Sequence, residues 1–178
     1  MNAPPTVKLL SASEMADNLP ALARLIVACV EDGASIGFIL PFTERMAHDF
    51  WQQMVLPGVT DGSRKLLVAR RNNIIVGTVQ LGLGTPANQP HRADVSKLLV
   101  SPDCRRSGIA TALMKQLENL AINENRRLLT LDTRTGDSAE PLYTALGYQT
   151  VGIIPNFCLD VAGERFDGTT VMFKQLPT

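Results

Sequence analysis

The sequence predicts one α/β domain, in which a mixed, mostly antiparallel sheet carries helices on both faces. Two observations lead to this prediction. Residues 65–70 and 74–83 are apolar segments joined by an Arg-Asn-Asn turn, which is typical of a β-hairpin. Residues 92–100 and 127–133 read as strands separated by a long amphipathic helix, the spacing of a right-handed parallel crossover. Nothing divides residues 1–178, so we expect a single domain.

The first elements come before the hairpin. Residues 6–12 alternate weakly and are expected to form an edge strand. Ser13 is expected to cap a helix that continues to Cys29, with a break or a new helix start at Pro20.

A loop over residues 33–41 follows, with two glycines and several apolar residues. Loops of this kind often line ligand sites, but many only connect helices. A second helix is expected over 42–56, ended by Pro57-Gly58. Its spacing predicts a buried apolar face made of Met46, Phe50, Trp51 and Met54.

The chain after the crossover completes the sheet. Residues 139–146 read as a short helix with Gly147 at its C-cap. Residues 148–154 and 169–176 read as two closing strands, and the geometry of 156–168 stays open.

Composition limits the function classes. The 178 residues hold 17 Lys plus Arg and 17 Asp plus Glu, so no global field favours nucleic acid or an anionic membrane. The three cysteines are far apart and form neither a disulfide framework nor a metal site. We therefore expect a cytoplasmic protein with no metal, no signal peptide and no membrane span, either a monomer or a homodimer.

The most informative stretch is a cationic turn between the strand at 92–100 and the long helix. Arg105 and Arg106 supply charge and forked donors, while Gly108 and Ala110 let another molecule approach the backbone. A helix N-terminus leaves N–H groups unpaired and carries partial positive charge. The turn therefore predicts a phosphate or pyrophosphate site, against the plain alternative of a basic surface turn.

Together, Leu98-x-Val100, Pro102 and Arg105-x-x-Gly108-x-Ala110 resemble the acetyl-CoA signature of the GNAT acetyltransferase superfamily. The resemblance covers roughly the last hundred residues well and implies the GNAT fold, with acetyl-CoA as co-substrate. The residues that it places at the cofactor are Leu98, Leu99, Val100, Arg105, Arg106, Ser107, Gly108, Ile109, Ala110 and Thr111.

The same resemblance implies catalytic residues. Tyr143 lies in an Ala-x-x-Leu-Tyr-x-x-x-Gly-Tyr pattern, where the superfamily's tyrosine serves as general acid toward the thiolate. Asp94 and Asp132 are candidates for binding the acceptor's ammonium or relaying its proton, although either can be an ordinary strand-end carboxylate. Many members place an asparagine where Gly136 stands, so Asp137 or Ser138 would take over its contact with pantetheine.

The whole chain looks most like the tabtoxin-resistance acetyltransferases, which acetylate an amino-acid-like β-lactam. Matching segments are 33–38, 92–98, 128–133 and 143–148, although Asp94 stands where glutamate is expected. The expected activity is N-acetylation of a small amino-acid-like amine by direct transfer in a ternary complex. The alternatives are a non-catalytic acyl-CoA-binding regulator and an acetyltransferase that acts on protein amines.

Overall fold

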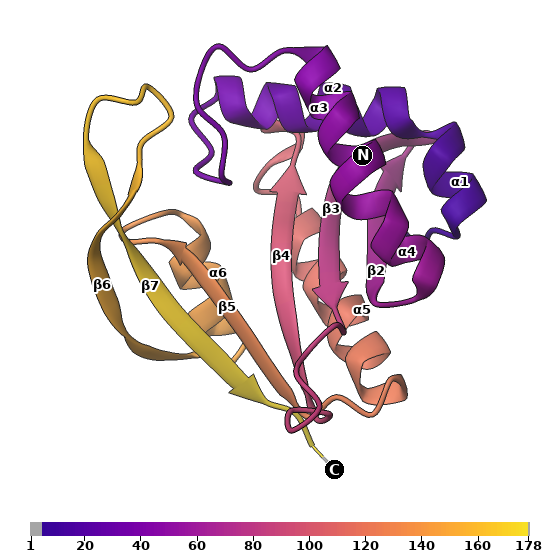
Figure 1. Ribbon diagram of the computed structural model, residues 1–178, viewed down its shortest axis with the longest axis vertical. Coiled ribbons are helices and arrows are strands. Elements are labelled where there is room, and N and C mark those ends of the chain that lie inside the picture. The colour runs from indigo at the N-terminus through magenta and orange to yellow at the C-terminus, as the bar shows by residue number, and fades with distance from the viewer. Residues whose placement is uncertain (1–4, 178) are drawn as a thin grey trace.

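The computed structural model describes residues 5–177 and confirms the predicted fold class. Seven strands form one sheet in the order β1-β2-β3-β4-β5-β7-β6 (Figure 1). Neighbouring strands are antiparallel except β4 and β5, which are parallel and joined by a helical crossover, as expected. The strands are β1 (Thr6–Leu9), β2 (Arg64–Arg71), β3 (Ile74–Gly82), β4 (Arg92–Val100), β5 (Leu128–Arg134), β6 (Gln149–Leu159) and β7 (Phe166–Gln175).

Helices cover both faces of the sheet and divide the core in two. On one face, α1 to α4 pack on Leu66, Val68 and Leu99; on the other, α5 and α6 pack on residues that include Val95 and Leu131 (Figure 1). The helices are α1 (Ala12–Asp17), α2 (Leu19–Glu31), α3 (Glu44–Asp49), a π-helix (Phe50–Val55), α4 (Leu56–Asp61), a 3-10 turn (Pro102–Cys104), α5 (Ile109–Asn123) and α6 (Ala139–Ala145). None of the helices within residues 5–177 has the length and apolarity that a membrane crossing requires.

The first helix begins earlier than the sequence predicts. Its N-cap is Ser11 rather than Ser13, because Ser11 and Glu14 form a reciprocal capping box. The expected break is present: α1 ends at Asp17, and Pro20 lies in the first turn of α2, where its missing N–H costs nothing.

The helix predicted over 42–56 is wrong in its register. A π-helical segment separates α3 from α4, and Pro57 lies in the first turn of α4 instead of ending a helix. The buried side chains are Ala47, Trp51 and Val55, whereas Met46 and Met54 are 49% and 68% exposed. Of the predicted face, Trp51 is fully buried and Phe50 packs against the core. Trp51 Nε1 donates to the carbonyl of Leu22 at 3.0 Å, which fixes this segment against α2.

The last two strands form a longer hairpin than predicted. β6 continues past residue 154 to Leu159, and β7 begins at Phe166. The hairpin rises beside the loop that joins α2 to α3 (Figure 1). Several apolar side chains of β6 are exposed, among them Val151, Ile153 and Phe157. This arrangement places the hairpin tip at the edge of the candidate site.

Candidate active site

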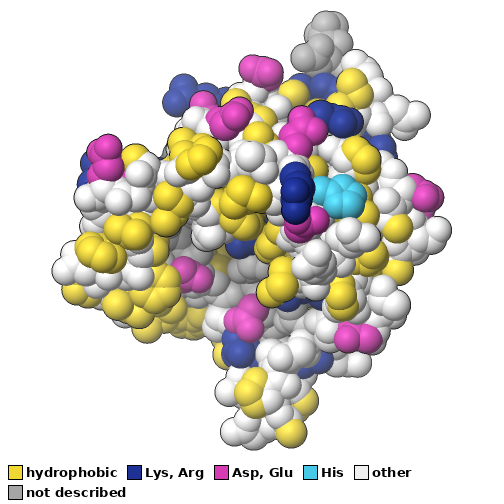
Figure 2. Space-filling model, turned by 45° about the horizontal axis from the view of Figure 1, so that its top comes forward, with side chains coloured by type: hydrophobic (Ala, Val, Ile, Leu, Met, Phe, Trp, Pro, Cys, Tyr) yellow, Lys and Arg dark blue, Asp and Glu magenta, His cyan; other side chains and the backbone are white. Residues whose placement is uncertain are grey.

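The site is formed where the parallel strands β4 and β5 separate. Their pairing runs only from Arg92 with Leu128 to Asp94 with Thr130, although both strands continue. Beyond Asp94, the side of β4 that faces β5 has no ladder partner, and a cavity of about 390 Å³ opens between the strands. It is lined by Asp94, Val95, Ser96, Thr130, Leu131, Asp132, Ile154, Phe157, Thr169 and Val171. Figure 2 shows a hollowed face on which acidic and basic side chains lie among hydrophobic ones.

A β-bulge in β4 shapes one wall of this opening. Gln80 pairs with Ser96 and Thr78 with Leu99, so Val79 alone opposes both Lys97 and Leu98. Lys97 takes a left-handed conformation with φ 51°, which is uncommon for a residue with a side chain. The buried Thr78 hydroxyl donates to the Lys97 carbonyl at 3.0 Å and holds the bulge. The extra residue reverses which face of the sheet each later β4 side chain occupies.

The two predicted carboxylates, Asp94 and Asp132, both line the cavity. Asp94 forms an ion pair with Arg92 and accepts a hydrogen bond from the Thr130 hydroxyl at 2.6 Å. Asp132 is exposed and accepts from the buried Thr169 hydroxyl at 2.9 Å. Asp132 forms no ion pair with any residue in the described part of the chain. Of the two, Asp132 is therefore the carboxylate whose charge is not used in an ion pair within residues 5–177.

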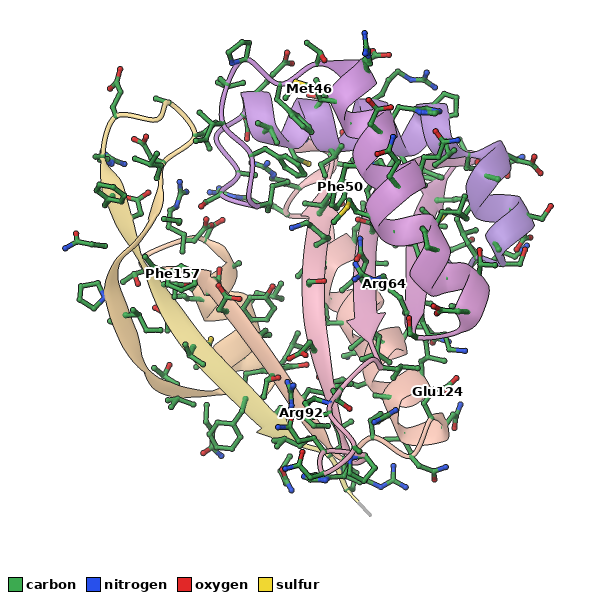
Figure 3. All side chains as sticks on the ribbon, viewed as in Figure 1. Met46, Phe50, Arg64, Arg92, Glu124 and Phe157 are labelled. Carbon is green, nitrogen blue, oxygen red and sulfur yellow. The ribbon has the colours of Figure 1, made fainter. Side chains whose placement is uncertain are left out.

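Two cations that the sequence reasoning missed lie on the same face of the sheet. Lys97 Nζ donates to the carbonyl of Ile36 at 2.7 Å and stands over the rings of Phe38 and Phe50, at 5.7 and 5.6 Å. Burial lowers the pKa of Lys97, the charge of Arg64 lowers it further, and the charge of Asp132 opposes both. Arg64 and Phe50 lie beside β3 and β4 on the side that carries α3 and α4 (Figure 3). Strand alternation alone would place the Lys97 side chain on the other face of the sheet, in the core under α5.

Tyr143 approaches from the other face, on α6. Its ring is buried and meets Tyr148 edge-on at 5.7 Å between centroids. Burial, and then the charges of Asp137 and Asp132, raise the pKa of Tyr143 well above its ordinary value, so the hydroxyl keeps its proton at neutral pH. No group within residues 5–177 hydrogen-bonds this hydroxyl, so it is not held by the backbone as a tyrosine with a purely packing role often is.

The cationic turn opens α5 as predicted. Gly108 is the N-cap with φ 80°, and a side chain there would meet no atom within 4 Å, so the space above the turn is open. The first helical bond runs from Ala112 N to Gly108 O, which leaves the N–H groups of Ile109, Ala110 and Thr111 without helical partners. The exposed Arg106 adds charge. This cradle fits a pyrophosphate.

The other arginines at the cradle divide into two roles. Arg105 forms an ion pair with Asp32 and donates from Nε to the Val100 carbonyl at 3.4 Å, so its charge ties the turn to the end of α2. Arg71, which the sequence places only in a hairpin turn, donates from Nη2 to the Ser107 hydroxyl at 3.2 Å. Its Nε is buried with no hydrogen-bond partner among the described residues. No sequence motif pointed to Arg71, because β2 is distant in the chain.

The residues expected at the pantetheine arm lie near the start of α6 and along β4. Asp137 forms an ion pair with Arg134 at 3.1 Å and accepts from the Ser138 hydroxyl at 3.1 Å. Both oxygens of the Asp137 carboxylate therefore already have partners at the start of α6. Leu99 is buried, whereas Leu98 and Val100 are half-buried and pack toward α5.

The loop between α2 and α3 is bonded to three elements near the cavity. It contacts the β6–β7 hairpin, where Leu40 N donates to Val161 O at 2.9 Å. Arg134 Nη1 of β5 donates to the carbonyl of Gly33 at 3.3 Å, and Lys97 Nζ of β4 donates to the carbonyl of Ile36. Segments that are far apart in the sequence therefore fix this loop beside strands that line the cavity, although the loop itself does not line it.

Comparison with known proteins is consistent across sequence and structure. Residues 29–157 match the family model described as an acetyltransferase (GNAT) domain. An uncharacterized N-acetyltransferase in the hisH-hisA intergenic region of Azospirillum brasilense is 29% identical over 115 residues. That match covers 63% of this chain and 66% of the relative, slightly under two thirds of its length.

Solved structures share the fold at low identity. The ribosomal-protein-alanine N-acetyltransferase of Brucella melitensis has a TM-score of 0.78 and 21% identity, over 96% of this chain and 99% of that one. The candidate acetyltransferase yncA of Salmonella typhimurium, solved with its cofactor acetyl-CoA, has a TM-score of 0.76 and 17% identity, over 99% and 96%. At these identities the likeness shows a common fold.

Proposed function

The chain belongs to the GNAT acetyltransferase family, and we propose that it transfers an acetyl group from acetyl-CoA to the amine of a small amino-acid-like molecule. The observation that carries the proposal is the opening between β4 and β5. The anion cradle of α5 and the side chain of Tyr143 belong to one face of the sheet, and Asp94 and Asp132 belong to the other. The opening connects the two, so a donor and an acceptor can meet there.

The cradle residues fit the donor. The N–H groups that begin α5, the open space at Gly108 and the guanidinium groups of Arg106 and Arg71 would hold its phosphates. When bound, acetyl-CoA supplies an activated thioester. The unpartnered side of β4 beyond Asp94 presents backbone groups that can orient the thioester arm and polarise its carbonyl.

Protons have defined routes in this proposal. Asp132, with Asp94 beside it, binds the acceptor's ammonium and takes up its proton, directly or through water, because an amine attacks only when neutral. Tyr143 holds the proton that the departing thiolate needs, and burial keeps it protonated. The transfer is then direct, from donor to acceptor in one complex.

The loop between α2 and α3 supports a small acceptor over a protein amine. It is bonded to the β6–β7 hairpin, to β4 and to β5, so in this proposal it stands beside the cavity and limits the size of an acceptor on that side. Detoxification of an amino-acid-like β-lactam, as the tabtoxin-resistance resemblance implies, is the finer form of this proposal. A cytoplasmic location is part of it, consistent with three free cysteines at positions 29, 104 and 158.

The test is acetyl-CoA-dependent thiol release across amino acids, β-lactam amino acids, polyamines and peptides. We expect turnover on small amino-acid-like amines and loss of it in Asp132→Asn. If only peptides were acetylated, the acceptor would be a protein amine and not a small amino-acid-like amine. If no amine in the panel gave thiol release while acetyl-CoA still raised the melting temperature, the result would contradict catalysis. It would support the alternative of an acyl-CoA-binding regulator.

A further inference from the structure

The acceptor side of the site contains more positive charge than its own carboxylates neutralise. The side chains of Lys97 and Arg64 are half-buried on the same face of the sheet: Arg64 bonds to Gln80, whose cross-strand partner Ser96 precedes Lys97, and the charge of Arg64 lowers the pKa of Lys97. Their closest polar partners are neutral: Lys97 donates to a backbone carbonyl, and Arg64 Nη1 donates to Gln80 Oε1 at 2.7 Å. Among residues 5–177 neither forms an ion pair. Partly buried cations without a counter-ion are costly, and an anionic ligand would offset that cost.

A buried hydrogen-bond donor without a partner, the side-chain amide of Gln80, lies next to Arg64. Gln80 is fully buried, its Oε1 is occupied by Arg64, and its Nε2 has no hydrogen-bond partner within the described chain. Gln80 is the cross-strand partner of Ser96, which lines the cavity. A buried amide N–H₂ group left unpaired costs stability unless a ligand or water accepts from it. Gln80 therefore adds a neutral donor to the two cations.

The backbone is distorted in a way that produces this cluster. Alternation along β4 would direct Lys97 to the face of Val95, which packs in the core under α5. The bulge and the left-handed conformation turn Lys97 to the face of Asp94 and Ser96 instead. Gly37 stands opposite, and a side chain there would come within 3.9 Å of Lys97 Nζ. Backbone strain of this kind is retained where a side chain must reach a particular place.

We propose that Lys97, Arg64 and the Gln80 amide form a subsite for a carboxylate or similar anion of the acceptor. The inference rests on the proposed function and narrows its substrate class. The acceptor is then zwitterionic: its amine is held by Asp132 and Asp94, and its acid group by Lys97 and Arg64. Simple monoamines and polyamines lack the acid group and are poor substrates.

A binding experiment tests the subsite without any turnover. ¹⁵N-labelled protein saturated with CoA is titrated with sodium acetate, with acetamide, and with sodium chloride at matched ionic strength. The Gln80 side-chain N–H₂ resonance, assigned by its loss in Gln80→Leu, is expected to shift saturably with acetate alone. Lys97→Met should weaken acetate binding by at least about tenfold, and Lys97→Arg by much less. Lys115→Met, which removes an exposed charge from α5, should bind acetate like the wild type.

A kinetic arm separates failure of the subsite from failure of the enzyme. For each accepted amino acid, kcat/KM is compared with that of its carboxamide, in the wild type and in Lys97→Met. The preference for the acid should fall by about tenfold or more in the variant. Equal effects of acetate and acetamide, or an unchanged acid preference in Lys97→Met, would overturn the subsite while leaving catalysis intact. Specific acetate binding with no turnover on any amine would support the subsite and overturn the proposed activity.

Discussion

Replacing Tyr143 with phenylalanine removes one oxygen atom whose loss should affect catalysis but not folding. The hydroxyl has no hydrogen-bond partner in residues 5–177, so no native hydrogen bond is lost and the ring keeps its contact with Tyr148. We expect the free energy of unfolding to change by less than about 1 kcal/mol. Loss of a positioned general acid lowers turnover by about 10² to 10⁴, which raises the activation barrier by roughly 3 to 5 kcal/mol.

The chain supplies its own matched control. Tyr148 is also buried, also lies against the other tyrosine, and also has a hydroxyl with no hydrogen-bond partner among the described residues. Thiol release is measured for both variants with the panel's best acceptor, together with CoA affinity by calorimetry and unfolding by urea. Tyr143→Phe should lose turnover with CoA affinity intact, and Tyr148→Phe should keep both. Wild-type turnover in Tyr143→Phe, or equal losses in the two variants, would refute the acid role.

Four further predictions concern the cradle, the base, the sheet and pH. Gly108→Glu should weaken CoA binding by about 100-fold or more in calorimetry, because the new carboxylate repels the phosphates. The matched variant Gly108→Ala measures the effect of backbone strain without the charge. Unchanged CoA affinity in Gly108→Glu would contradict the proposed phosphate site. Asp132→Asn should lower kcat/KM by at least about tenfold without changing CoA affinity, and unaltered kinetics would make it structural. Gly77→Ala should destabilise the protein by about 1 to 3 kcal/mol in urea, because its Cβ would lie 2.8 Å from a β4 carbonyl oxygen; Gly152→Ala, with no atom within 4 Å, should stay within about 0.5 kcal/mol. Burial raises the pKa of both tyrosines, so native protein should show no tyrosinate absorbance near pH 10 while unfolded protein does. The pKa of each tyrosine is higher in the folded protein than in the unfolded one. The stabilisation that this difference gives is therefore complete below about pH 10 and falls as the pH rises further. If the tyrosines of the native protein titrated near pH 10, the prediction would be contradicted.

Local sequence was sufficient to predict an element where the conformation of that segment depends only on residues close to it in the chain. The crossover from β4 through α5 to β5, the cradle at Gly108 and the position of Tyr143 on α6 were all predictable, because spacing, glycine and helix periodicity act over a few residues. The segment 42–56 was not, since a π-helix inserted between α3 and α4 changes the period on which the prediction depends. Half of its predicted apolar face is correct: Phe50 and Trp51 pack in the core, and Met46 and Met54 are exposed.

By itself, then, the sequence determined the fold class and the cationic turn that opens α5, and it predicted the candidate catalytic side chains Asp94, Asp132 and Tyr143. Tertiary structure alone decided what surrounds them. Whether Lys97 faces the core or the acceptor depends on a bulge set by pairing with β3, which strand alternation cannot reveal. Lys97 and Arg64 come from strands that are distant in the chain, and they lie on one face of the sheet because β2, β3 and β4 are neighbours. Such placements follow from strand order and register, which are long-range properties.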